Sequence, residues 1–229
     1  MRIYSNFKEM HSEVGRDLVE LGTFHSSDSV QGWKVKGNPL YDMKEIIGYS
    51  YKLESIKDAH ELFEKNEWDY LFAEVAERVC GQPSNPGKSW EHRREVWEPM
   101  LDIRNRFDYT YSERIAPQLN YVVEELEKNP NSRQGVILIY DKRDRYCFGG
   151  VERIPCSLSY QFLVRGGYVH IIYNMRSCDY FTHFKFDSVL AYMLMDWMAI
   201  HLKRLAGTLT HNIGSLHCFR QDWEKAKIF

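Results

Sequence analysis

The stretch QFLVRGGYVHIIYNM, residues 161–175, places Gly166 and Gly167 between two apolar runs. Two such runs separated by a pair of glycines are typical of a β-hairpin, because glycine adopts the positive φ angles that a two-residue turn needs. The flanking residues are polar: IPCSLSYQF, residues 154–162, leads into the first run, and RSCD, residues 176–179, follows the second. We therefore expect the chemistry of the protein to lie beside this hairpin.

The rest of the chain alternates between helical and strand-like patterns. Some segments carry apolar residues at helical spacing, whereas others are short, apolar and rich in β-branched or aromatic residues. One segment, GQPSNPGKS, is a loop by its glycine, proline, serine and asparagine content. These patterns predict helices over residues 58–80 and 113–129, strands over residues 44–51 and 135–141, and a loop over residues 81–89.

The last long segment, residues 187–207, is apolar on nearly all sides. Lys203 and Arg204 near its end, followed by Gly207, form a favourable charge and cap pattern for a helix C-terminus. The pattern predicts a buried helix that ends at this glycine.

Length and composition limit the class of protein. The 229 residues favour one domain, residues 1–229, and a charged fraction of 27% is ordinary for an ordered globular chain. A net charge of -2, with interspersed signs, disfavours nucleic acid as a partner. The N-terminus lacks the pattern of a signal peptide, and no stretch approaches the roughly 18 apolar residues of a membrane span. We expect a cytoplasmic protein that has no membrane partner.

The chain has five cysteines, an odd number, and no CxxC pair. This set argues against a disulfide framework and against a structural zinc site, so we expect free thiols and no metal. A lone cysteine in a chain of this size is more often a small hydrophobic residue than a nucleophile. Spacing alone therefore leaves the role of Cys156 open.

Three motifs occur in a fixed order: PC at residues 155–156 with QF at 161–162, RSCD at 176–179, and GSLH at 214–217. In this order and at these intervals they resemble the thymidylate synthase family, which includes deoxycytidylate hydroxymethylases, and we expect this chain to be most similar to those enzymes. The resemblance is strongest over residues 132–219. It implies an α/β (α+β) subunit with a thymidylate synthase-like fold, in which a large mixed β-sheet is flanked by helices and mediates a homodimer.

The resemblance also implies a covalent reaction. Cys156 matches the nucleophile of the family, whose thiolate adds to carbon 6 of a pyrimidine nucleoside monophosphate. Carbon 5 can then attack the one-carbon unit of 5,10-methylene-tetrahydrofolate, the expected co-substrate. Arg176 resembles the arginine that binds the nucleotide phosphate near this sulfur, where a cation favours the thiolate.

The resemblance divides the phosphate site between two subunits. It places Ser177 at the phosphate and brings Arg133 to it from the partner subunit, where a planar guanidinium suits bidentate binding. Without the resemblance, Arg133 would be a surface arginine before a strand. Gln134 stands where the synthases commonly have a second arginine, and Lys34 or Lys36 is a candidate to supplement the site.

Asp187 stands where thymidylate synthases have an asparagine that binds the uracil edge. A carboxyl group that shares a proton with the base can complement the amino group and ring nitrogen of cytosine, so Asp187 indicates a cytosine nucleotide. The alternative is a helix N-cap. Gln161 resembles the glutamine beside the pyrimidine, or is an ordinary polar residue at a strand start. His217 resembles the histidine at the sugar hydroxyl, and Phe219 replaces the tyrosine usual two residues later.

Four further residues complete the expected site. Asp179 resembles the aspartate that binds the pterin ring, and Trp97 is an aromatic wall beside it or a core residue. Glu74 is the candidate acid for water and proton transfer, with a solvated helix glutamate as the alternative. Tyr109 matches a tyrosine near the carbon 5 proton, or is a half-buried strand or loop residue.

Two departures from the synthases bear on the product. His183 replaces a glycine of the synthases, and the chain ends at Phe229 without their longer tail, which favours water at the reacting carbon. We therefore expect conversion of dCMP, methylene-tetrahydrofolate and water to 5-hydroxymethyl-dCMP. Methylation of dCMP, hydroxymethylation of CMP, and a non-catalytic relative that binds nucleotide or RNA are the alternatives.

Overall fold

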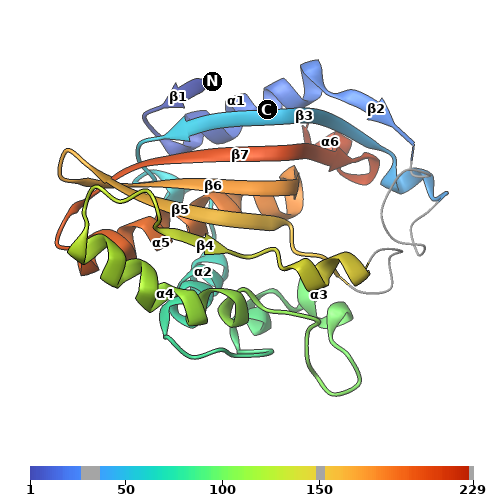
Figure 1. Cartoon of the computed structure of the whole chain (residues 1–229). Coiled ribbons are helices and arrows are strands. Elements are labelled where there is room, and N and C mark those ends of the chain that lie inside the picture. Colours follow the sequence, from blue (N-terminus) through green and yellow to red (C-terminus); the bar gives the residue numbers. More distant parts are fainter. Residues whose placement is uncertain (27–36, 148–152, 227–229) are drawn as a thin grey trace.

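The predicted hairpin is confirmed. In the computed structural model, which describes residues 1–26, 37–147 and 153–226, strand β5 (Ser157–Arg165) pairs antiparallel with strand β6 (Tyr168–Asp179) (Figure 1). Gly166 and Gly167 form the two-residue turn, with φ angles of 59° and 86°. Positive φ at both positions is the geometry of the type I′ turn, whose twist matches that of the flanking strands.

The described residues form a seven-stranded mixed sheet with the strand order β1-β3-β7-β6-β5-β4, in which β2 also pairs with β3. The pairs β1–β3 and β6–β7 are parallel, and the other pairs are antiparallel. The parallel pairing of β6 and β7 brings Asp179 beside His217 at the ends of their strands. The remaining strands are β1 (Arg2–Tyr4), β2 (Thr23–His25), β3 (Met43–Leu53), β4 (Val136–Leu138) and β7 (Leu205–Phe219).

Helices pack on one face of this sheet, and Figure 1 shows α5 behind the central strands with α2 and α4 below the β4 edge. Helix α5 is the most apolar of them, and ten of its residues are buried. The predicted fold class, a mixed sheet flanked by helices, is confirmed. The helices are α1 (Phe7–Leu21), α2 (Lys65–Val79), α3 (Arg94–Trp97), α4 (Tyr111–Lys128), α5 (Lys185–His201) and α6 (Trp223–Ala226).

An aromatic stack forms the centre of the core on the helix side of the sheet. The ring of Tyr173 lies between those of Tyr160 and His211, with ring centroids 4.5 and 4.6 Å apart. All three side chains are essentially inaccessible to solvent, and burial lowers the pKa of His211 to about 3. The imidazole is therefore neutral and packs as an aromatic ring across strands β5, β6 and β7.

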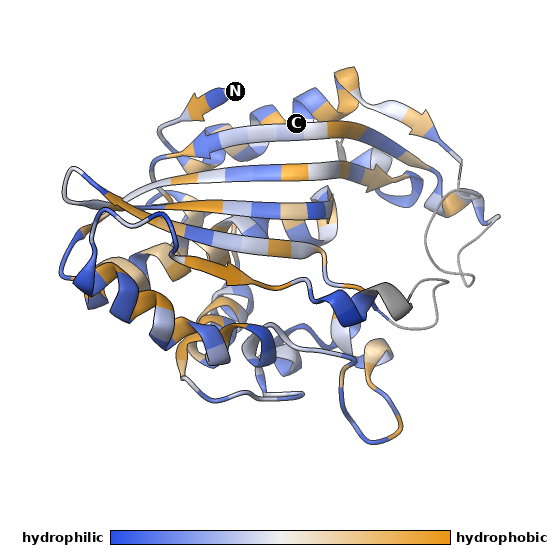
Figure 2. Cartoon of the chain, in the orientation of Figure 1, coloured by the Kyte–Doolittle hydropathy of each residue, from blue (hydrophilic) through white to orange (hydrophobic). Residues whose placement is uncertain are grey.

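The opposite face of the same strands is polar. Ser50 donates a hydrogen bond to Asn212, Asn212 to Asn174, and Asn174 to Ser159, over distances of 2.9–3.1 Å. Figure 2 shows the corresponding alternation of hydrophilic and hydrophobic residues along the central strands. This two-residue period follows from the pleat of a strand, which directs successive side chains to opposite faces.

The predicted end of the last long helix is wrong. Helix α5 ends at His201, and Lys203 adopts a left-handed conformation with φ of 53° before strand β7 begins. Gly207 lies inside β7, where a Cβ atom would approach the ring of His170 to 2.6 Å and the carbonyl oxygen of Val169 to 2.8 Å. The glycine permits close approach of β6 and β7 and does not cap the helix.

Several predicted boundaries also differ from those observed. The helix expected over residues 58–80 is α2, which begins only at Lys65 behind a capping box formed by Glu64 and Glu67. The strand expected over residues 135–141 is limited to the three residues of β4. By contrast, β3 extends the expected strand at both ends, and α4 follows its predicted range closely.

None of the helices in the described ranges combines the length and apolar character that a membrane crossing requires. Within the same ranges, four cysteines are free thiols: Cys80, Cys156, Cys178 and Cys218. Lys34 and Lys36, the candidates for the phosphate site, lie outside the described residues.

The hairpin turn provides a direct test of the fold. Gly166 has a φ of 59° and open space around its Cβ position, so a substitution there is limited by backbone conformation alone. We expect Gly166→Val to lower the free energy of unfolding by about 1–2 kcal/mol, whereas Gly166→Asn changes it little, since asparagine tolerates the left-handed region. Urea denaturation measures both variants, and equal losses would contradict the assigned turn.

Candidate active site

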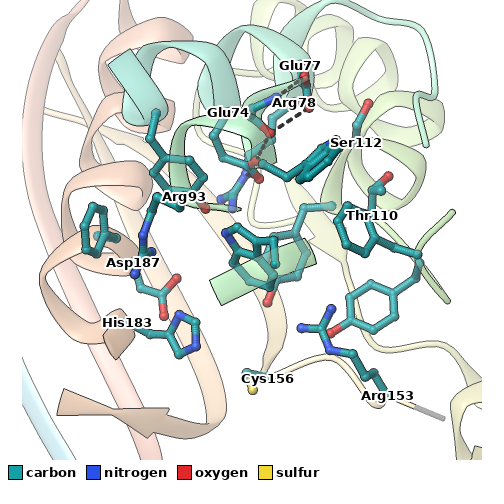
Figure 3. A pocket seen from close by; sticks show the side chains of 18 of the residues that line it. Glu74, Glu77, Arg78, Arg93, Thr110, Ser112, Arg153, Cys156, His183 and Asp187 are labelled. Carbon is teal, nitrogen blue, oxygen red and sulfur yellow. Dashed lines mark hydrogen bonds and ion pairs between the residues drawn. The ribbon is translucent and has the colours of Figure 1, made fainter. Parts of the chain in front are cut away.

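A cavity that is partly open to solvent lies beside the end of the hairpin (Figure 3). Its walls come from α2, the segment 86–112, the residues before β5, the end of β6 and the first turn of α5. Chain segments far apart in sequence therefore meet at one site. Eight residues singled out from the sequence line the cavity: Glu74, Trp97, Tyr109, Cys156, Ser177, Asp179, His183 and Asp187.

Cys156 lies immediately before β5. Arg176 of the adjacent strand β6 binds the main chain of the two residues that precede the cysteine. The Nε atom of Arg176 donates a hydrogen bond to the carbonyl oxygen of Pro155, and its Nη2 atom donates to that of Ile154, both over 2.9 Å. The same Nη2 atom lies 3.9 Å from the sulfur of Cys156. The guanidinium therefore fixes the main chain of the cysteine and places positive charge beside its sulfur.

Opposing effects act on the Cys156 thiol. Burial raises its pKa, and the negative charges of Asp187 and Asp179 reinforce this effect. Arg176 and Arg153 act in the opposite direction. Because burial dominates, the sulfur is a protonated thiol near neutral pH, and its activation requires additional positive charge or a proton acceptor.

Asp187 lies in the first turn of α5 and lines the cavity. The helix begins at Lys185 with Phe184 as its N-cap residue, and no side chain caps it. The alternative that Asp187 is the N-cap is therefore wrong. The thiol of Cys178 lies 3.8 Å from the Oδ2 atom of Asp187. The carboxyl group is thus available to a ligand in the cavity.

Burial raises the pKa of Asp187 to about 7. Arg78 and Arg93 lower it, whereas the neighbouring carboxylate of Glu74 raises it. Desolvation outweighs the two cations because a carboxylate in a low-dielectric cavity loses most of its hydration. Near neutral pH the group is divided between its acid and ionised forms, so it can donate as well as accept a hydrogen bond.

Glu74 belongs to a buried ion pair and is not a solvated helix residue, so that alternative is wrong. Its Oε1 atom accepts a hydrogen bond from Nε of Arg78 at 2.9 Å, and its Oε2 atom accepts one from Ser89 at 2.7 Å. Arg78, which is only 2% exposed, continues to the hydroxyl of Tyr160 at 3.2 Å. This chain of contacts joins helix α2 to the central strands below the cavity.

Aromatic rings form the wall opposite Asp187. The ring of Trp97 lies 5.6 Å from that of His183, and the guanidinium of Arg153 lies 5.2 Å from Trp97 and 5.4 Å from Tyr109. Burial raises the pKa of Tyr109 to about 12 and lowers that of His183 to about 3. Both rings are therefore neutral, and Arg153 supplies the positive charge on this side (Figure 3).

The structure does not bring every expected residue to the cavity wall. Arg133 is exposed before β4, and its carbonyl oxygen accepts a hydrogen bond from the side chain of Gln161 at 2.9 Å. Gln161 alternates with buried Tyr160 and therefore projects from the opposite face of β5. The expectation that Gln161 reads the pyrimidine is not supported within one subunit. His217 is buried beside Asp179, outside the cavity lining.

Three lining arginines, Arg78, Arg93 and Arg153, were missed by the sequence analysis. Arg78 looked like an ordinary charge on an amphipathic helix, and Arg93 belongs to the polar run EHRRE. Only Arg153, three residues before Cys156, carried a positional signal. Nothing in a linear pattern shows that these guanidinium groups are directed into a shared cavity.

The described residues contain no group of three or more histidine, cysteine or acidic side chains that could hold a metal ion.

The profile described as thymidylate synthase matches residues 43–228. This chain belongs to the thymidylate synthase family. Its fold agrees with that of thermostable thymidylate synthase A from Bacillus subtilis, with a TM-score of 0.74 and 16% identity, over 98% of this chain and 83% of that chain.

Both thymidylate synthases and a deoxycytidylate hydroxymethyltransferase are among the relatives that match this chain. A putative thymidylate synthase of Methanosarcina barkeri is 27% identical over 52% of this chain and 56% of its own length. The thymidylate synthase of Buchnera aphidicola is 24% identical over 60% of this chain and 54% of its own length. Deoxycytidylate 5-hydroxymethyltransferase of Enterobacteria phage T4 is 26% identical over 56% of this chain and 58% of its own length. The match thus spans somewhat more than half of each relative, and these similar identities favour no specific member, contrary to the expectation of a nearest hydroxymethylase.

The contact between Arg176 and Cys156 predicts the reactivity of the thiol. Arg176→Gln removes a charge that lowers the pKa of Cys156. We expect alkylation of Cys156 at mildly alkaline pH to slow by about tenfold, the effect of one pKa unit. Mass spectrometry of the peptide that contains Cys156 separates it from exposed Cys80. Arg16→Gln is the matched control, since Arg16 is exposed on α1 and pairs with Glu13. An equal rate in both variants would contradict the role of Arg176.

The raised pKa of Asp187 predicts a pH-dependent stability. Its folded pKa of about 7 lies above the ordinary aspartate value of 3.8, so its contribution to stability is present at acid pH and is lost as pH rises through about 7. We therefore compare the free energy of unfolding of Asp187→Asn with that of the wild type at each pH. We expect this difference to favour the variant by about 2–3 kcal/mol more at pH 8 than at pH 5. Urea denaturation at both pH values measures it, and a pH-independent difference would show that Asp187 is ionised throughout.

Proposed function

We propose that the protein transfers a one-carbon unit from methylene-tetrahydrofolate to carbon 5 of dCMP and releases 5-hydroxymethyl-dCMP. The overall reaction consumes dCMP, methylene-tetrahydrofolate and water and yields 5-hydroxymethyl-dCMP and tetrahydrofolate. One observation carries the choice of base: Asp187, whose pKa is about 7, lines the same cavity as the Cys156 thiol. A carboxyl group that is partly protonated at neutral pH can donate to the ring nitrogen of cytosine and accept from its amino group.

In the proposed reaction, Cys156 is the nucleophile and Asp187 is the acid. The Cys156 sulfur, after losing its proton, forms a bond to carbon 6, and the electron pair of the carbon 5–carbon 6 double bond moves toward carbon 5. Asp187 stabilises the negative charge by donating its proton to the ring nitrogen. Glu74, held by Arg78 and Ser89, is placed to hold a water molecule or a proton near carbon 5. Carbon 5 would then bond to the one-carbon unit, and the ring nitrogen would return its proton to Asp187. Loss of the carbon 5 proton would accompany cleavage of the bond between that carbon and tetrahydrofolate, which leaves. Water would add to the transferred carbon as its hydroxyl group, and expulsion of the sulfur would restore the ring.

The cavity fits a folate co-substrate. Trp90 and Trp97 line it, and their indole nitrogens are buried donors without a protein partner. Unsatisfied buried donors are uncommon, and an acceptor-rich ring system such as pterin offers suitable partners. Asp179 and Trp97 would hold this ring, and Tyr109 would lie near the carbon 5 proton. Methylene-tetrahydrofolate supplies carbon at the oxidation level of formaldehyde, so formation of the hydroxymethyl group needs no reductant.

We place the nucleotide phosphate near Arg176 and Ser177, with Arg133 contributed by the partner subunit of a homodimer. Two observations support this arrangement. Arg133 is exposed and lies outside the cavity of its own subunit. The helices of the described ranges pack on the sheet face opposite the polar ladder from Ser50 to Ser159. Two such faces can pack against each other and bring each Arg133 toward the other subunit.

A second candidate is methylation in the manner of a thymidylate synthase. The relatives named thymidylate synthase and the phage hydroxymethyltransferase match at 24–27% identity, so the family comparison supports either product. A methyl group would require a hydride from the folate and a site that excludes water. The cavity is partly open to solvent, which favours the hydroxymethyl product.

Product analysis tests the proposal. Purified protein is incubated at slightly acid pH with methylene-tetrahydrofolate and with dCMP, CMP or dUMP in separate reactions, and the nucleotides are identified by mass spectrometry. We expect 5-hydroxymethyl-dCMP from dCMP and no product from Cys156→Ser, because the covalent step is lost. Asp187→Asn should lower conversion of dCMP by at least about 100-fold, the scale of a lost acid catalyst. A methyl product would select the second candidate, and no product with any nucleotide would reject both.

A further inference from the structure

Arg93 is a buried cation that the proposed reaction does not use. Its side chain lies in the cavity wall with only 7% of its surface exposed, and its guanidinium stacks 3.7 Å from the ring of Phe186. Nη2 donates to the carbonyl oxygen of Thr182 at 2.8 Å, whereas Nη1 is buried without a hydrogen-bond partner. Among the described residues, no carboxylate forms an ion pair with Arg93.

Arg78, the other central guanidinium of the cavity, has hydrogen-bond partners in the protein on both sides. It is paired with Glu74 and also donates to Tyr160. Burial of a cation without such partners is strongly unfavourable, and the remaining donor of Arg93 therefore calls for an acceptor that the protein alone does not supply.

Asp187 lies on the same side of the cavity as Arg93. Arg93 stacks on Phe186, the residue directly before Asp187, and its charge acts on the Asp187 carboxyl group. In Figure 3 the Arg93 side chain extends toward this carboxyl group. A nucleobase whose edge contacts Asp187 therefore also faces the Nη1–H group of Arg93, which has no partner in the protein.

We propose that Arg93 and Asp187 together read the base, with Asp187 in its acid form selecting cytosine and Asp187 in its ionised form, with Arg93 as second donor, selecting uracil. The inference rests on the proposed nucleotide site. The acid donates to the unprotonated ring nitrogen of cytosine and accepts from its amino group. The carboxylate instead accepts from the ring N–H of uracil, and Arg93 donates to the adjacent carbonyl oxygen.

The other groups around Asp187 do not provide this switch. Glu74 and Arg78 face it from α2 and are paired with each other. Burial lowers the pKa of His183 and raises those of Cys156 and Cys178, which keeps all three neutral. The neighbouring tyrosines are also kept neutral by burial, which raises their pKa values: Tyr51, Tyr70, Tyr111, Tyr160 and Tyr173.

Nucleotide binding without folate tests the inference independently of turnover. Calorimetry measures the affinities for dCMP and dUMP from about pH 6 to about pH 8.5, and their ratio cancels the titration of the phosphate that both share. We expect the wild-type ratio to shift toward dUMP by on the order of tenfold per pH unit across this range, because it follows the ratio of acid to ionised Asp187. A ratio that is constant across this range would overturn the proposal.

Substitution of Arg93 assigns the donor. In Arg93→Met, dUMP affinity should fall by at least about tenfold at alkaline pH, while dCMP binding should persist to higher pH because a cation that favours ionised Asp187 is gone. Arg93→Lys retains the charge and should retain the wild-type dCMP profile. Arg94→Met is the matched control, since Arg94 is exposed and pairs with Glu91 and Glu98.

The outcomes separate this inference from the proposed function. Unchanged dUMP binding in a folded Arg93→Met protein would reject Arg93 as the donor, even if dCMP is converted to product. A pH-dependent ratio that Arg93→Met shifts toward dCMP, and that Arg94→Met leaves unchanged, would support the paired reading, even if no tested nucleotide is turned over.

Discussion

The site depends on one buried contact, the pairing of Arg78 with Glu74 and Tyr160. It joins α2, which forms the roof of the cavity, to the central strands that form its floor. Removing one partner would leave an uncompensated charge where water cannot solvate it, which is far more costly than losing a surface ion pair. The distance between helix and sheet, and with it the width of the cavity, is therefore set by a polar contact inside an apolar core.

The low dielectric of this region accounts for the unusual protonation states in the cavity. The same desolvation that strengthens the Arg78–Glu74 pair raises the pKa of Asp187 to about 7 and holds Cys156 as a thiol. Charges in the cavity are consequently sensitive to whatever ligand displaces water. In the proposed complex, the nucleotide phosphate would lie near Arg176 and the base near Asp187, so the base would meet a group that can exchange a proton or share a hydrogen bond.

Local sequence was a good guide where a short-range rule decides the structure. The hairpin at Gly166 and Gly167 follows from the positive φ that its turn requires, and α4 follows from its apolar period and its cap at Thr110. Local sequence was a poor guide where contacts with a distant strand decide the local conformation. The glycine at position 207 fits a helix cap by pattern, but it lies in β7 because β6 passes close to it. Asp187 likewise resembled a helix cap until the start of α5 was known.

The sequence by itself determined the family, the hairpin and the presence of a thiol, an RSCD segment and a late acidic residue in a recognisable order. These features depend on residue types at fixed spacing along one chain. Only the tertiary structure decided that Arg78, Arg93 and Arg153 line the cavity with Cys156 and Asp187, and that Gln161 lies on the other face of its strand. Burial and charge pairing are properties of the three-dimensional surroundings, so a side chain's protonation and its available hydrogen bonds are set only when distant segments pack together.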